Sequence, residues 1–182
     1  MGPINNNYVR IKFNKRSANP CVSHKSVDIL LLIKSAARNE ENRDLVRSTW
    51  ANVSHLAQVN ATVKYAFLVG IKQFPTIPPS LNYEIGNHSD LILLDYVDNV
   101  YRNNTYKTMG ALKWTLEKCP QARYIALFDD DLFVNVTNLA KFLRRRSKVP
   151  RGNSTVFDAG LTTELFAGKV RPAAMFKPHS KS

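Results

Sequence analysis

The sequence predicts an α/β fold in which a mostly parallel sheet is flanked by helices. Apolar segments of strand length occur at residues 27–33, 63–69, 91–95 and 123–128. Segments of helix length stand between them, and chains that alternate strands with helices form parallel sheets with right-handed crossovers. The length of 182 residues and the 44% apolar fraction suit one globular domain with a sizeable core.

The first strand is expected at residues 27–33, which are apolar on both faces, as a central parallel strand should be. A helix is expected to follow, with Asn39 as its N-cap and Glu40 and Glu41 in its first turn, where acidic side chains suit the helix dipole. The buried side of this helix is expected to carry Leu45, Val46 and Trp50.

The second strand is expected at residues 63–69 and ends at Gly70. A proline-rich loop at 74–79 and a short helix at 81–87 lead to the third strand at 91–95.

A longer helix is expected at residues 104–118, before the fourth strand at 123–128. Apolar residues at helical spacing predict that its buried face carries Met109, Leu112, Leu116 and Cys119. Both tryptophans, Trp50 and Trp114, are expected in the core. A last helix is expected at 136–146, and residues 156–167 suit a hairpin or a strand and loop.

Three consecutive carboxylates, Asp129, Asp130 and Asp131, follow the fourth strand directly. Aspartates repel one another and have poor strand propensity, so a bound cation is the simplest way to offset their charge. Side chains alternate along an extended chain, which would place Asp129 and Asp131 on the same side. Their oxygens suit Mn²⁺ or Mg²⁺, and ligands of open α/β sheets bind at this end of the strands. The alternative is a solvated turn that caps the next helix.

The net charge of +12 predicts an anionic partner: nucleic acid, an anionic membrane surface or a phosphate-bearing small molecule. The basic run at 141–148 suits the polar face and C-terminal end of a helix, where cations complement the dipole. No nucleic-acid-binding motif accompanies it, so we expect no nucleic-acid partner.

Residues 1–26 are polar and are expected to form a flexible lead-in or stem before a domain at 27–182. The longest apolar run, 27–33, is too short to span a bilayer, and the N-terminus lacks the apolar stretch of a signal peptide. No signal or transmembrane segment is therefore expected in this chain.

One feature nevertheless points to a lumenal protein, and a second is compatible with one. N-glycosylation sequons begin at Asn52, Asn60, Asn87, Asn103, Asn135 and Asn153. Applied to this composition, the Asn-X-Ser/Thr rule predicts about two sequons by chance. The chain has two cysteines, Cys21 and Cys119, which allow one disulfide in an oxidising compartment or two buried free thiols.

Several stretches, taken together and in order, resemble one known family. They are Arg43–Trp50, Phe67–Gly70, Asp90–Ile92, Asp95–Thr108, Lys113–Trp114, Cys119–Pro120, Asp129–Asp131 and Phe133–Asn135. The chain is similar to the β-1,3-glycosyltransferases of glycosyltransferase family 31 over roughly residues 27–181. The apolar Leu127 and Phe128 before the acidic triplet resemble its brainiac-like branch.

The resemblance implies a GT-A fold, whose Rossmann-like half binds the nucleotide. It implies an inverting, Mn²⁺-dependent transfer of galactose or N-acetylhexosamine from a UDP-sugar to a glycan hydroxyl in β-1,3 linkage, on glycoprotein or glycolipid. It also implies the Golgi lumen or membrane. Residues 27–182 are expected to be a partial GT-A domain, with the acceptor-site segments, the presumed catalytic base and the membrane anchor of the family outside this chain. The alternative is an inactive remnant that binds UDP and metal.

The resemblance also implies roles for individual residues. Asp131 is expected to be the firmest metal ligand, with Asp129 as its partner. Asp129 or Asp130 can instead bind the ribose or the sugar. Arg38 can pair with phosphate or stack on uracil, or be a solvated loop arginine. The general base of the transfer is left unassigned.

Five further residues are candidates for the nucleotide site. Arg43 and Arg47, one helical turn apart, can face it, and the alternative is a surface ion pair with Glu40 or Asp44. Asp98, like Asp95, can contact the nucleoside or cap the next helix. Lys107 can hold a carboxylate or phosphate, or be an ordinary exposed helix lysine.

Overall fold

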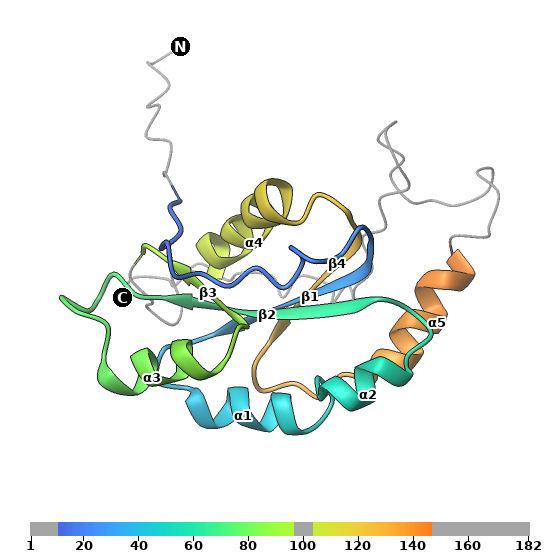
Figure 1. Ribbon diagram of the computed structural model, residues 1–182, viewed down its shortest axis with the longest axis horizontal. Coiled ribbons are helices and arrows are strands. Elements are labelled where there is room, and N and C mark those ends of the chain that lie inside the picture. Colours follow the sequence, from blue (N-terminus) through green and yellow to red (C-terminus); the bar gives the residue numbers. More distant parts are fainter. Residues whose placement is uncertain (1–10, 97–103, 147–182) are drawn as a thin grey trace, which may run out of the picture. The chain divides into compact units, whose positions relative to one another are not determined.

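The computed structural model describes residues 11–96 and 104–146 (Figure 1). In that part of the chain the strands are β1 Val27–Ser35, β2 Val63–Gly70, β3 Leu91–Leu94 and β4 Ala122–Asp129. The helices are α1 Glu40–Ser48, α2 Val53–Gln58, α3 Pro79–Asn87, α4 Asn104–Lys118 and α5 Val136–Arg146. One compact unit extends to Phe142, and Leu143 begins another, of which the described residues include only the end of α5.

The strands form one parallel sheet in the order β3-β2-β1-β4, which confirms the predicted fold class. In the central strand, Ile33 stands opposite Phe67 of β2 and Phe128 of β4. Figure 1 shows α4 on one face of the sheet and α1, α2 and α3 on the other. Because the strands are parallel, all four carboxyl ends lie at one edge. We call this the carboxyl edge, and the opposite one the amino edge.

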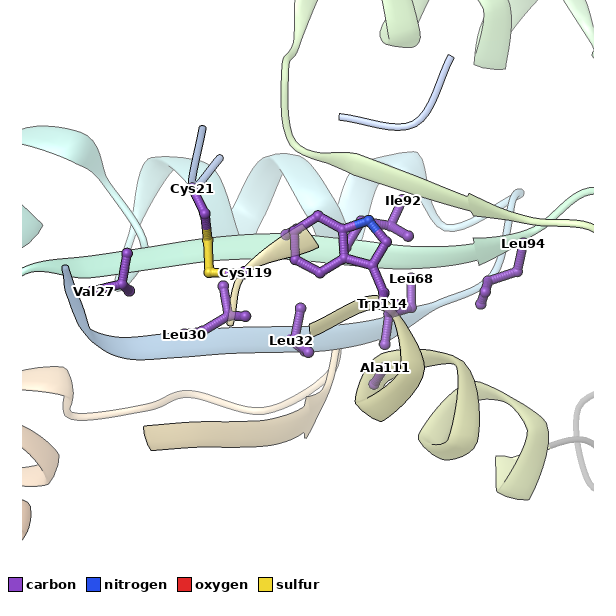
Figure 2. Packing of buried hydrophobic residues seen from close by; sticks show 11 residues of the cluster. Cys21, Val27, Leu30, Leu32, Leu68, Ile92, Leu94, Ala111, Trp114 and Cys119 are labelled. Carbon is purple, nitrogen blue, oxygen red and sulfur yellow. A yellow bond between two sulfur atoms is a disulfide. The ribbon is translucent and has the colours of Figure 1, made fainter. Parts of the chain in front are cut away.

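The core between α4 and the sheet contains Leu30, Leu32, Leu68, Ile92 and Trp114, all 1% exposed or less. Figure 2 shows Trp114 of α4 among the side chains of β1, β2 and β3, so its predicted core position is confirmed. The helix approaches closely at Gly110, where a Cβ atom would lie 2.8 Å from Leu94 Cδ2.

The buried face of α4 differs from the predicted one. Met109, Leu112 and Leu116 are 54%, 40% and 76% exposed. The residues that face the sheet are Lys107, Gly110, Ala111, Trp114 and Thr115. Small residues let the helix lie close to the sheet while Trp114 fills the remaining space. Of the predicted set, Cys119 is buried as expected.

On the opposite face, Trp50 is 3% exposed, which confirms its core assignment. Its indole Nε1 donates to the Leu132 carbonyl oxygen at 2.9 Å, and its ring lies edge-on to Phe128 at 6.1 Å. Val46 is buried as predicted, but Leu45 is 62% exposed. The expectation for Leu45 was wrong because α1 turns Arg43 and Val46 inward, and the neighbouring position then faces solvent.

Helix α2 was not predicted, although its start carries a recognisable signal. Asn52 Oδ1 accepts from the backbone N–H groups of Ser54 and His55, at 2.9 and 3.4 Å. An asparagine with this pattern is a strong N-cap. The helix is only six residues long, so its apolar periodicity is too short to stand out.

Part of the expected lead-in packs on the domain. Phe13 bridges Leu94 in antiparallel sense, and Ala18 N donates to the Leu91 carbonyl oxygen at 2.8 Å. Cys21 is joined to Cys119 by a disulfide, which decides between the two alternatives that the sequence left open. The domain boundary at residue 26 stays a prediction, and residues 1–10 and 156–167 lie outside the described segments. Within those segments, no helix has the length and apolar character needed to cross a bilayer.

Candidate functional site

The acidic triplet lies at the carboxyl edge of the sheet, as predicted. Asp129 is the last residue of β4, and its Oδ1 lies 3.0 Å from Lys34 Nζ on β1. Half of the Asp129 side chain, 53%, remains exposed. The sequence analysis missed Lys34, whose signal was a single cation at the end of the apolar run Ile29–Ile33.

Asp130 and Asp131 lie in a turn, because β4 ends at Asp129. The period-two alternation used to place Asp131 beside Asp129 therefore stops before it reaches Asp131. The triplet does not cap α5 either, since Asn135 Oδ1 accepts from the Asn138 N–H at 2.9 Å at the start of that helix. Asp129 and Asp131 remain a predicted metal pair.

Asp130 is bound to the start of α1. Its carboxylate accepts from Asn39 Nδ2 at 3.0 Å and from Asn42 Nδ2 at 3.5 Å. Asn39 thus occupies the predicted N-cap position without a side-chain cap bond, because its amide is directed to Asp130 instead. This link ties the turn after β4 to the helix that follows β1.

Asp131 is exposed, and no residue in the described segments forms a hydrogen bond or ion pair with it. The same is true of Arg38, in the loop between β1 and α1. Both loops follow strands that pair with each other, so they leave the sheet at the same edge. Among the described residues, no group of three or more metal-ligating side chains is present.

Arg43 lies inside the protein, with 0% of its surface exposed. Its five N–H groups donate to Glu84 Oε1 and Oε2, Ser35 Oγ and the carbonyl oxygens of Ala36 and Ala37, at 2.5 to 3.2 Å. A guanidinium has five such donors, so this set uses all of them. The arrangement gives Arg43 a structural role at the end of β1 and does not support direct contact with a nucleotide.

Arg47 is bound in the same network. It donates to Asp90 at 2.8 and 2.9 Å, to Glu84 at 2.6 Å and to Asp44 at 2.7 Å. The alternative ion pair with Asp44 is therefore present, although buried acids take most of the donors. Burial opposes the charge of Arg47, but the hydrogen bonds and charge of Asp90, followed by those of Glu84 and Asp44, raise its pKa above the ordinary value.

Lys107 is buried, contrary to the expectation of an ordinary exposed helix lysine. Its Nζ donates to the carbonyl oxygen of Ser35 at 2.7 Å, and it is 8% exposed. Lys107 and Arg43 thus hold the carboxyl end of β1 from both faces of the sheet, just before Arg38. Asp95, the residue after β3, is exposed, and Asp98 lies outside the described segments.

A hollow of about 610 Å³ lies away from the acidic triplet, at the amino edge. Its lining includes the start of β2, the turn before β3, part of α2, and residues Asn19, Pro20, Ser23 and His24. The Tyr65 side chain belongs to this lining. Burial, followed by the negative charge of Asp90, raises the pKa of Tyr65 to about 12.

We expect one tyrosine to titrate near pH 12, well above the ordinary value of 10.0. The contribution of Tyr65 to stability should be fully present below pH 10 and lost as the pH rises through about 12, since the unfolded chain ionises first. Ultraviolet absorbance of tyrosinate measures this titration. Tyr65→Phe should remove the late step, and an unchanged curve would contradict the assignment.

The chain is similar in sequence to one known protein family and to several of its members. The sequence model of the galactosyltransferase family matches residues 41–165. A lactosylceramide 1,3-N-acetyl-beta-D-glucosaminyltransferase A of Danio rerio is 35% identical over 126 residues, which cover 66% of this chain and 33% of the relative. The human lactosylceramide 1,3-N-acetyl-beta-D-glucosaminyltransferase is 30% identical over 129 residues, 69% of this chain and 34% of its own length. A human N-acetyllactosaminide beta-1,3-N-acetylglucosaminyltransferase 4 is 34% identical over 126 residues, which cover 68% of this chain and 32% of the relative. The chain spans about a third of the length of these relatives.

Proposed function

Because the chain belongs to the galactosyltransferase family, glycosyltransferase family 31, we propose that it is the nucleotide-binding half of a β-1,3-glycosyltransferase of GT-A fold. The donor in this proposal is a UDP-sugar and the acceptor a glycan hydroxyl on glycolipid or glycoprotein. The names of the relatives favour N-acetylglucosamine as the sugar and a lactose-containing glycan as the acceptor. The observation that carries the proposal is the position of three consecutive aspartates at the carboxyl edge of a parallel sheet, where such folds bind their ligands.

The acids of this edge have distinct roles in the proposal. Asp131 is exposed and forms no hydrogen bond or ion pair with another described residue, which suits a ligand of Mn²⁺ or Mg²⁺. Asp129 is half exposed, and within residues 11–96 and 104–146 its one ion pair is with Lys34, so it is the second candidate ligand. Asp130 contacts α1 and holds the turn in place. A divalent cation bound here would supply Lewis-acid stabilisation of the diphosphate leaving group.

Cationic side chains complete the proposed site. Arg38 is the described arginine best placed to contact a phosphate or the uracil, because its side chain is exposed in the loop after β1. Arg43 and Lys107 donate hydrogen bonds to backbone carbonyl oxygens just before Arg38, and so fix the backbone from which its side chain extends. In this proposal they act as positioning residues, and Asp98 keeps its predicted role at the nucleoside.

We place the protein in the Golgi lumen, on the basis of the family and of the buried disulfide, which suits an oxidising compartment. The alternative function is binding of UDP and metal without transfer. The general base that an inverting transfer requires stays unassigned in this proposal. Transfer of the sugar from a UDP-sugar to a lactoside acceptor by the purified chain would exclude this alternative.

Binding at the acidic triplet is tested by thermal unfolding. UDP with Mn²⁺ should raise the melting temperature of the protein by several degrees, since a ligand at a hundred times its Kd stabilises by about 2.7 kcal/mol. Asp131→Ala should abolish the shift. Glu117→Ala, which removes an exposed carboxylate of α4, is the matched control and should keep it. An equal shift in Asp131→Ala would remove the site assignment.

A further inference from the structure

The sequon asparagines in the described segments are of two kinds. Asn52 and Asn135 stand at helix starts, where the Oδ1 atom of each accepts from the first turn of α2 or α5. Asn60 and Asn87 are exposed, as Asn135 is, but they lie away from the helix starts. Asn60 is in the bend between α2 and β2, and Asn87 is the last residue of α3.

Asn60 and Asn87 share one edge of the protein. Asn60 precedes β2 and Asn87 precedes β3, and these strands are parallel neighbours. Both asparagines therefore lie toward the amino edge, whereas the acidic triplet follows β4 at the carboxyl edge. The hollow at the amino edge is lined by the residues that follow Asn60 and by Asn87 itself. A bulky, hydrated group attached here would leave the carboxyl edge open.

The hydroxyl residues of the two sequons are also outside the core. Ser89 is exposed, and Thr62 is partly exposed in the approach to β2. The Thr62 backbone N–H donates to Asp28 Oδ2 at 2.7 Å. An N-linked glycan needs space in solvent, and both asparagines are exposed.

The disulfide supplies an independent reason to consider this modification. Cys21 and Cys119 are both 0% exposed and are joined across a sequence separation of 98 residues. Disulfides form and persist in oxidising compartments such as the endoplasmic reticulum, and are rare in the cytosol. A chain that acquires this bond has passed through the compartment in which sequons are modified.

We propose that Asn60 and Asn87 carry N-linked glycans. In each case the side-chain Nδ2 loses one proton and forms a bond to C1 of the reducing-end sugar of a lipid-diphosphate-linked oligosaccharide. The bond between that C1 and the diphosphate oxygen breaks, and the lipid diphosphate leaves. A separate oligosaccharide transferase catalyses this step. The proposal is confined to these two of the described sites, because Asn52 is partly buried and Asn135, although exposed, accepts a hydrogen bond from the first turn of α5.

The test is direct mass spectrometry of the whole chain, secreted from cultured eukaryotic cells behind a cleavable signal. Enzymatic removal of N-glycans in heavy-oxygen water should convert Asn60 and Asn87 into labelled aspartate. The combined variant Asn60→Gln, Asn87→Gln should lose the mass of two glycans, and Asn52→Gln, the matched control, should keep it.

The wild-type peptide masses decide the proposal even when a variant is not secreted. Thr62→Ala and Ser89→Ala are second variants, since they destroy the sequons and retain both asparagines. Disulfide-bonded, secreted protein with an unmodified asparagine at either position would overturn the proposal for that position. The readout does not involve sugar transfer, so it is independent of the proposed function.

Discussion

Glu84→Gln is expected to lower the free energy of unfolding by about 3–5 kcal/mol, because it removes one partner of a buried ion-pair network. The Glu84 side chain is 1% exposed and bonds to Arg43, which is fully buried, and to Arg47, which is 10% exposed. Without the carboxylate, Arg43 keeps its charge but retains only uncharged acceptors. Chemical denaturation monitored by far-ultraviolet circular dichroism measures the loss.

The control for Glu84 is Asp44→Asn. Asp44 also pairs with Arg47, at 2.7 Å, but 59% of its side chain is exposed. Exposed pairs contribute about 0–1 kcal/mol, so this variant should unfold close to wild type. Equal losses from the two variants would show that burial does not set the strength of the network.

The Glu84 network also predicts a dependence on pH. Burial alone would raise the pKa of Glu84, but hydrogen bonds from Arg43 and Arg47 outweigh it and hold the pKa below the ordinary value of 4.5. The resulting stabilisation is present above pH 4.5 and is lost as the pH falls through the lower, folded-state pKa. Glu84→Gln should lack this acid-dependent part of the stability.

Removal of the disulfide is the second change with a large expected effect. The double variant Cys21→Ser, Cys119→Ser should lose about 2–5 kcal/mol of unfolding free energy, since the bond closes a long loop and restricts the unfolded chain. The sequence separation of 98 residues makes this loop more than half the length of the protein. The bond also attaches the segment before β1 to the end of α4, beside Trp114 (Figure 2).

A reducing agent distinguishes the disulfide from a general effect of the substitutions. Reduction should move the unfolding midpoint of wild type toward that of the double variant, and should leave the double variant unchanged. A double variant with the midpoint of oxidised wild type would mean that the bond contributes nothing to stability.

Local sequence determined the fold class, the main strands and the family. Each strand of the sheet is rich in apolar residues, and several boundaries carry glycine or charged residues, such as Gly70 at the end of β2 and Asp95 after β3. The acidic triplet was placed at the carboxyl edge for the same reason, because the apolar run of β4 leads directly into Asp129. These features depend on near neighbours in the chain, so the sequence alone contains them.

The tertiary structure decided which side chains face one another. Arg43 and Glu84 are 41 residues apart, Asn39 and Asp130 are 91 apart, and Cys21 and Cys119 are 98 apart. The two apolar faces of α4 look equally suitable in the sequence, and only the close approach to β3 at Gly110 selects the one with Trp114. Such contacts depend on how whole helices and strands pack, which brings distant segments together. They produce no periodic pattern in the sequence of either segment. Packing therefore made Arg43 a structural residue and left Asp131 and Arg38 open at the carboxyl edge.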